Sequence, residues 1–142
     1  MARQHPEALK TFNTKVIDEF RANSGRVGGR FEGADLLLLS TTGARSGERR
    51  VNPLQYVRVG GRITVVGAYA GADLDPAWVH NLRANPHAHI ELGEQSFAVL
   101  AHELPADERE PVWAQIITAE GGFADYQSRT HRLLPLFTLD PV

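Results

Sequence analysis

The stretch that decides the fold is LLLLSTTGARSGERRVNPLQY, residues 36–56, in which two extended segments flank a short polar turn. Four leucines followed by Ser-Thr-Thr have the length and composition of a buried strand. Gly43 and Gly47 then bound a turn, and both glycines can adopt the positive φ angles that tight turns use. The chain becomes extended again from Arg49. The stretch therefore predicts an antiparallel pair of strands.

The turn between these strands is rich in cations, with Arg45, Arg49 and Arg50 set against the single carboxylate of Glu48. Guanidinium groups match phosphate and carboxylate, and the backbone N–H groups of such a turn can form a concave nest for an anion. The turn leads into a strand and lacks the lysine of a nucleotide-binding P-loop. It is interpreted as an anion receptor, and the alternative is a solvated hairpin tip with ordinary surface arginines.

The remaining extended segments are joined by short connections. Gly60-Gly61 and Gly93-Glu94 are two-residue hairpin signals, and Pro135 interrupts the last segment, which suits an edge strand. Consecutive parallel strands would need long crossovers, so these connections favour a meander or barrel. The predicted strands after the first pair are 62–66, 87–92, 95–101 and 133–139.

Helices are expected between these strands. Apolar residues recur at helical spacing in residues 7–23, whose helix packs on the core, or alternatively covers the site or touches lipid. Asp75 and Pro76 are interpreted as the N-cap and first residue of a short helix that ends at Asn85. Two further helices are expected near residues 105–120 and 123–131, and the glycine-rich residues 25–33 are interpreted as a mobile loop or linker. The fold class is α+β, a small barrel of about six mostly antiparallel strands with three to four flanking helices.

Composition limits the class of protein. The 142 residues include 42% hydrophobic and 23% charged residues with a net charge of −2, as in a soluble domain without a broad nucleic-acid-binding surface. There is no cysteine, which fits a reducing cytoplasm, and no apolar run of membrane-spanning length. The expectation is a cytoplasmic single-domain protein that binds no nucleic acid.

No constellation of catalytic side chains is evident. Ser46 has no nucleophile-elbow context, and His87 and His89 lie two apart without further ligands of metal-binding spacing, so no metal is predicted. Any catalysis is therefore expected to depend on a bound cofactor, for which the protein supplies position and electrostatics.

Several motifs in order along the chain resemble the deazaflavin-dependent nitroreductase family. They are Thr42-Gly-Ala-Arg-Ser-Gly47, Arg50-Val-Asn-Pro-Leu54, Pro76-Ala-Trp78, Asn81-Leu82 with Ala84-Asn-Pro86, and Asp125-Tyr-Gln-Ser128. The resemblance implies a split β-barrel over residues 34–142, preceded by an N-terminal helix and loop over residues 1–33. It also implies coenzyme F420, an 8-hydroxy-5-deazaflavin with a phosphate and an acidic oligoglutamate tail.

The resemblance further implies which residues meet the cofactor. Arg45, Ser46 and Arg50 would hold the phosphate and tail, while Phe123 and Tyr126 would face the substrate, with Tyr126 as a candidate catalytic residue. The full set implied to line the cofactor is Ala44, Arg45, Ser46, Arg50, Val51, Asn52, Pro53, Leu54, Gln55, Val66, Gly67, Ala68, Tyr69, Ala77, Trp78, Val79, His80 and Asn81.

The chain also departs from the family pattern. Ala68-Tyr69-Ala70-Gly71 stands where the family often has Ser-Lys-Gly-Gly, and Phe123 replaces a frequent tyrosine. The implied function is hydride transfer from reduced F420 to a quinone, an activated alkene or a nitro compound. The alternatives are a deazaflavin carrier with little turnover and a split barrel that binds FMN or haem. A homodimer and a peripheral membrane contact are both compatible with the sequence.

Overall fold

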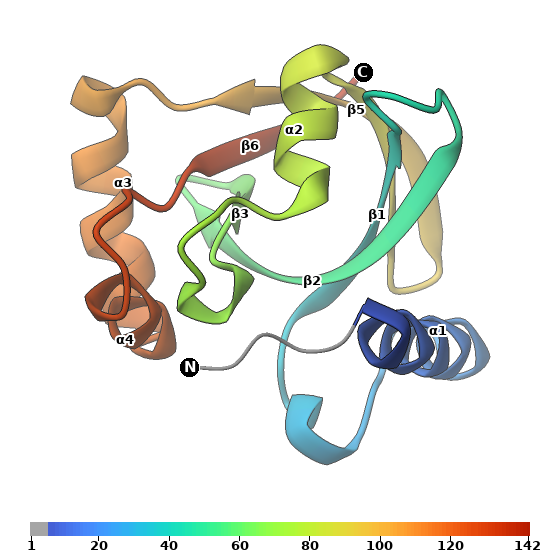
Figure 1. Ribbon diagram of the computed structural model, residues 1–142. Coiled ribbons are helices and arrows are strands. Elements are labelled where there is room, and N and C mark those ends of the chain that lie inside the picture. The colour runs from blue at the N-terminus through green and yellow to red at the C-terminus, as the bar shows by residue number, and fades with distance from the viewer. Residues whose placement is uncertain (1–5) are drawn as a thin grey trace.

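The computed structural model describes the backbone of residues 6–142 and the side chains of residues 11–29, 31–69 and 71–142. Its centre is a closed barrel with the strand order β1-β2-β3-β6-β5-β4, in which β4 pairs with β1 and every pair is antiparallel (Figure 1). The strands are β1 (Leu36–Thr42), β2 (Arg49–Val59), β3 (Arg62–Val66), β4 (His87–Leu92), β5 (Gln95–Glu103) and β6 (Leu136–Pro141). The α+β barrel predicted from the sequence is confirmed.

The leucine run forms β1 because both faces of that strand are buried. Leu37 and Leu39 point into the barrel, whose core also contains Phe137. Leu36 and Leu38 point outward and pack against α1 (Pro6–Ala22). A strand buried on both faces reads as a continuous apolar run instead of an alternating one. The α1 helix therefore lies across the outside of the barrel, next to β1 and β2 (Figure 1).

The other helices cover different parts of the barrel. The short helix α2 (Ala77–Ala84) inserts Trp78, Val79 and Leu82 into the barrel core and so closes one end (Figure 1). On another side, α3 (Ala106–Ala119) and α4 (Gly122–Ser128) pack on a second apolar cluster. Two 3₁₀ turns, η1 (Gly29–Phe31) and η2 (Tyr69–Gly71), complete the described elements.

Two local predictions about prolines and caps are wrong. Helix α2 begins at Ala77 after Pro76, and no side chain caps its N-terminus, because the Asp75 carboxylate instead accepts hydrogen bonds from Arg83 and Arg132. Pro135 precedes β6, which lies between β3 and β5 and is not an edge strand. The Pro135 carbonyl accepts a 2.8 Å hydrogen bond from the N–H of Gly67.

Part of the glycine-rich segment after α1 packs against the barrel, and its interpretation as a mobile loop or linker stays a prediction. Val27 is buried, and the N–H of Gly28 donates to the Glu19 carboxylate at 2.5 Å. Gly25 has φ of 94°, and a Cβ added there would lie 2.9 Å from the Cα of Gly93 in the β4–β5 hairpin. Close backbone approach explains why glycine is needed at this position.

Candidate functional site: a cationic cleft

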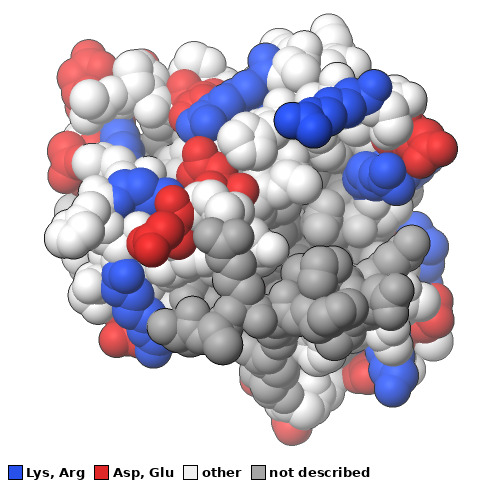
Figure 2. Space-filling model, viewed as in Figure 1, with Lys and Arg blue, Asp and Glu red and all other residues white. Residues whose placement is uncertain are grey.

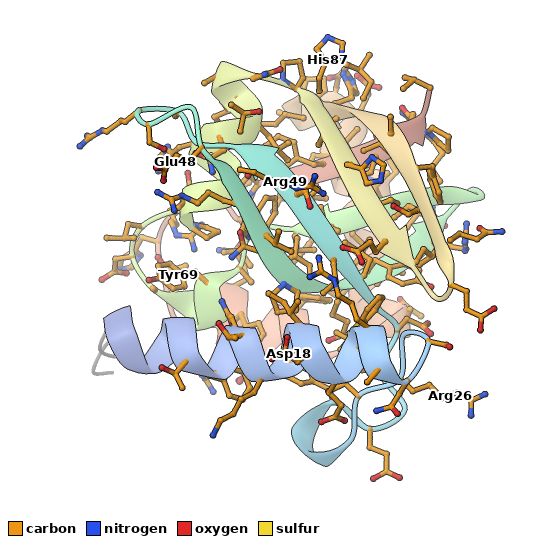
Figure 3. All side chains as sticks on the ribbon, turned by 90° about the vertical axis from the view of Figure 1, so that its right-hand side faces the viewer. Asp18, Arg26, Glu48, Arg49, Tyr69 and His87 are labelled. Atoms are coloured by element: carbon orange, nitrogen blue, oxygen red, sulfur yellow. The ribbon has the colours of Figure 1, made fainter. Side chains whose placement is uncertain are left out.

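A cleft of about 980 Å³ opens where the β1–β2 turn, α1, α2 and η2 meet. The part of its lining that the structure describes contains three arginines and no aspartate or glutamate. Figure 2 shows Lys and Arg side chains along the upper right of this face, and Figure 3 shows Tyr69 between the turn that carries Glu48 and the helix α1. The described lining consists of Asn13, Thr14, Ile17, Gly43, Ala44, Arg45, Ser46, Arg49, Arg50, Val51, Asn52, Tyr69, Ala77, His80 and Asn81.

The β1–β2 turn is held largely by its own hydrogen bonds. Gly43 N–H donates to the Glu48 carbonyl at 2.7 Å, Gly47 N–H donates to the Gly43 carbonyl at 2.9 Å, and Glu48 N–H donates to Ser46 Oγ at 3.1 Å. Of the predicted nest, only the N–H groups of Arg45 and Ser46 have no acceptor within the described residues. These two adjacent donors are available to an anion.

The two glycines of the turn serve different purposes. Gly47 has φ of 72°, as expected, but Gly43 does not adopt a positive φ. A Cβ added at Gly43 would lie 2.6 Å from Ser46 Oγ, so glycine provides space there. Of the two glycines that could adopt a positive φ, only Gly47 therefore does so.

A buried asparagine fixes the turn to α2. Asn81 is 6% exposed; its Oδ1 accepts the Ala44 N–H at 2.9 Å and its Nδ2 donates to Thr41 Oγ1 at 3.1 Å. Because both ends of the amide are used inside the protein, Asn81 acts through the position of the turn. Asn81 lines the cleft, as the resemblance implied, but its side chain is bonded to Ala44 and Thr41.

The three arginines of the cleft differ in how they are engaged. Arg45 makes no hydrogen bond or ion pair to any described residue. The Arg49 Nη2 donates to Ser40 Oγ at 3.0 Å, and the Arg50 Nη2 lies 3.3 Å from Glu48 Oε2 in an exposed pair. Exposed pairs of this kind contribute little to stability. Arg45 and Arg50 can therefore turn toward an anionic ligand at small cost.

The residues that the structure describes in the walls opposite the arginines are neutral. Asn13, Thr14 and Ile17 come from one face of α1, and Tyr69 comes from η2. Tyr69 is 38% exposed and has φ of 45°, in the left-handed region that non-glycine residues rarely adopt. The cleft thus combines a cationic rim with an uncharged interior wall.

The structure brings about half of the implied cofactor residues to this cleft. Those in its lining are Ala44, Arg45, Ser46, Arg50, Val51, Asn52, Tyr69, Ala77, His80 and Asn81. Leu54, Trp78 and Val79 pack in the barrel core, and Val66 and Ala68 belong to the second apolar cluster. Pro53, Gln55 and Gly67 also lie outside the lining. Direct contact between these residues and a ligand stays a prediction.

The two implied substrate-side aromatics lie behind η2. Phe123 and Tyr126 are on α4 with ring centroids 6.2 Å apart, and Phe123 is buried in the second cluster. A Cβ added at Gly71 of η2 would lie 2.8 Å from the Tyr126 carbonyl oxygen. Neither aromatic lines the cleft, so their role on the substrate side stays a prediction.

Sequence reasoning missed one wall of the cleft. Asn13, Thr14 and Ile17 were not among the implied residues, although covering of the site by this helix was one alternative. The available signal was that these residues flank the apolar face formed by Val16 and Phe20, so a helix packed on β1 presents them beside the turn. Gly43 and Arg49 also line the cleft without having been in the implied set.

Metal ligation finds no support in the described part of the chain, where no three His, Asp or Glu side chains form a group that could hold an ion. His89 Nε2 instead lies 2.5 Å from Ser96 Oγ on the outer face of β4 and β5. His87 is on the same exposed face, which no helix covers in the view of Figure 3.

Comparison with known proteins gives a consistent result. Residues 13–141 match the family model described as F420H2-dependent quinone reductase. The F420H2-dependent quinone reductase Rv1261c of Mycobacterium tuberculosis is 37% identical over 126 residues, which are 84% of this chain and 83% of that protein.

Solved structures agree with this match. An F420H2-dependent reductase named FDR-A is 34% identical with a TM-score of 0.67, over 75% of this chain and 94% of its own. A domain-swapped dimer is 32% identical with a TM-score of 0.69, over 96% and 100% of the two chains. The haem storage protein HutZ of Vibrio cholerae, at 20% identity and a TM-score of 0.56, shares the fold.

Proposed function

We infer that this chain, which belongs to the F420H2-dependent quinone reductase family, is an oxidoreductase that uses coenzyme F420 and places it in the cationic cleft. The cofactor, when bound, supplies a hydride to an organic acceptor. The family match supports the enzyme class and the cofactor, while the quinone as acceptor follows the names of the relatives.

The cleft suits the shape and charge of this cofactor. A phosphate and oligoglutamate tail needs a cationic site, and the described lining carries Arg45, Arg49 and Arg50 without a carboxylate among its residues. The N–H groups of Arg45 and Ser46 add two backbone donors without acceptors in the described structure. The tail is therefore proposed to bind at the turn. The cluster of arginines and backbone donors in the turn is the observation that carries the assignment of the site.

The ring of the cofactor is proposed to lie along the neutral wall, between Val51 and Asn52 of β2 and the residues of α1 and η2. These residues bind and orient a planar group and exclude water from it. Arg45 and Arg50 fix the far end by charge-assisted hydrogen bonds, each worth about 1.5–3 kcal/mol. Phe123 and Tyr126 remain proposed substrate-side residues, which would act from behind η2.

The acceptor is proposed to be a quinone, with activated alkenes and nitro compounds as further classes that one acceptor panel distinguishes. A homodimer is proposed because a structural neighbour at 32% identity is a domain-swapped dimer. No helix within residues 6–142 has the length and apolarity to cross a membrane. A cytoplasmic location with peripheral membrane contact stays a proposal from the sequence.

The decisive experiment is a fluorescence titration of the protein with F420 and, separately, FMN, for the wild type, Arg50→Ala and Arg58→Ala. Arg58 is a matched control because it lies on the same strand but outside the cleft. We expect F420 to bind and its Kd to rise about tenfold in Arg50→Ala, as loss of one charge-assisted contact predicts, with no change in Arg58→Ala. Binding of FMN without F420 would contradict the cofactor assignment.

A carrier that binds F420 with little turnover is the second candidate, since Tyr69 and His80 of the lining have no hydrogen bond to a described residue that would orient them as an acid or base. Oxidation of F420H2 with a panel of quinones, alkenes and nitro compounds separates the two. Turnover of a quinone supports the enzyme, whereas binding without turnover of any acceptor supports the carrier.

A further inference from the structure

One arginine far from the cleft in sequence is bonded to the loop that forms its neutral wall. Arg132 lies between α4 and β6, and its side chain is only 15% exposed. Its guanidinium donates to the carbonyl oxygens of Ala72 at 2.8 Å, Ala68 at 2.9 Å and Gly67 at 3.1 Å. The three carbonyls bracket η2, which carries Tyr69.

The arginine is itself held in place. Its Nη1 lies 2.7 Å from Asp75 Oδ1, and its backbone carbonyl accepts a 2.7 Å hydrogen bond from Gln127 Nε2 on α4. The other oxygen of Asp75 accepts a 3.1 Å bond from Arg83 on α2. One carboxylate therefore links the arginine behind η2 to the helix that forms the neighbouring wall of the cleft.

The loop needs such support because its backbone is strained. Tyr69 has φ of 45°, and a non-glycine residue in the left-handed region costs about 1–2 kcal/mol and persists only where surrounding contacts fix it. Within the turn, Gly71 N–H donates to the Ala68 carbonyl at 2.9 Å and Ala72 N–H donates to the Tyr69 carbonyl at 3.0 Å. These two local hydrogen bonds leave the strained turn dependent on contacts from outside it.

We propose that Arg132 is a positioning residue, which fixes η2 through three of its carbonyl groups and thereby sets how Tyr69 faces the cleft. The planar fork of arginine can reach three carbonyls and a carboxylate at once, whereas the ammonium of lysine is a single point. The effect on F420 rests on the proposed function, but the effect on the loop does not.

The test compares Arg132→Lys with Arg83→Lys by hydrogen exchange of the Gly71 and Ala72 amides in the protein without ligand. Arg83 is a matched control because it also pairs with Asp75 but touches none of the loop carbonyls. We expect exchange of the two amides to rise about tenfold in Arg132→Lys, as loss of about one net hydrogen bond predicts, and to stay unchanged in Arg83→Lys. Equal exchange in both variants would overturn the proposal.

Titration of the same variants with F420 measures whether the change in the loop alters ligand binding in the cleft. We expect the Kd to rise about fivefold or more in Arg132→Lys and less than twofold in Arg83→Lys. Faster amide exchange with an unchanged Kd would overturn the link to Tyr69. Failure of the wild type to bind F420 would instead overturn the proposed function, while the exchange comparison still tests the loop.

A second variant keeps the proposal testable if Arg132→Lys does not fold. Asp75→Asn retains an oxygen acceptor for Arg132 but removes the charge that anchors the guanidinium. Exchange of the Gly71 and Ala72 amides is expected to rise about threefold, and exchange equal to that of the wild type and of Arg83→Lys would overturn the proposal.

Discussion

The β1–β2 turn and the η2 loop form facing parts of the same cleft, yet they are stabilised in opposite ways. The turn is closed by hydrogen bonds among its own residues 43–48, and one buried amide from α2 adds to them. The loop has two internal bonds and depends on a guanidinium about sixty residues further along the chain. Local stabilisation leaves the charges of the turn available to a ligand, whereas long-range stabilisation lets the loop hold a strained tyrosine.

The largest expected contrast comes from adding one methyl group to a glycine in each region. Gly71→Ala places a side chain at φ of 79° and puts its Cβ 2.8 Å from the Tyr126 carbonyl oxygen and 2.9 Å from Arg129 Cβ. Strain and overpacking together should lower the free energy of unfolding by about 3 kcal/mol. Gly47→Ala, with φ of 72° and nothing within 4 Å, should cost about 1 kcal/mol. Urea unfolding measures both, and equal losses would contradict the contrast.

The second prediction concerns the amide that joins the turn to α2. Asn81→Ala leaves the Ala44 N–H and the Thr41 hydroxyl without their partner. The free energy of unfolding should fall by about 2 kcal/mol, because buried polar groups lose their hydrogen bonds. F420 binding should weaken as well, since the turn loses its support. Asn85→Ala, which removes an exposed bond to the His87 N–H, is the control and should cost under about 1 kcal/mol.

The third prediction separates binding from stability within the turn. Arg45→Ala should raise the Kd for F420 about tenfold without changing the unfolding midpoint, because Arg45 has no partner among the described residues but lines the cleft. The ratio of the Kd of Arg45→Ala to that of the wild type should shrink as sodium chloride is added, since salt screens exposed charges. A ratio independent of salt would argue against an ionic contact.

The smallest effect is expected outside both regions, where α2 meets β5. Arg83 binds both oxygens of Glu103, at 2.9 Å and 2.8 Å, and this hydrogen bonding holds the pKa of Glu103 below its ordinary value of 4.5. The contribution is present above the ordinary pKa and is lost as the pH falls through the lowered one. It should stay below about 1 kcal/mol because both groups are more than a third exposed.

Urea unfolding from pH 7 to pH 3 checks this smallest effect. Arg83→Gln should be slightly less stable than the wild type at pH 7 and equally stable at the acid end. A difference that persists at pH 3 would show that Arg83 acts through packing or through its pair with Asp75, and not through Glu103.

The sequence was sufficient for the parts whose causes are local. The leucine run and the hairpin glycines at 60–61 and 93 each predict a strand or a turn from a few residues, and the structure has the corresponding strands and turns. The resemblance pointed to the turn and to the helix that carries Asn81, and both line the cleft. These features need no knowledge of residues distant in the chain.

Features that depend on distant partners could not be predicted. Asp75 precedes a helix and looks like a cap, but Arg83 and Arg132 compete for its carboxylate. Pro135 looks like an edge residue until β6 is known to lie between β3 and β5. The α1 wall follows from how the helix lies on β1 and β2, and the spacing of its residues does not specify that placement.

The position of β6 has a consequence for how the chain is made. The first five strands emerge from the ribosome with a gap between β3 and β5, and each of these two strands then presents an unpaired row of backbone donors and acceptors. Such open edges are sites of aggregation and of pairing with other chains. The barrel can close only after residues 136–141 have been synthesised. Any fragment that ends before Leu136 should therefore be prone to aggregation.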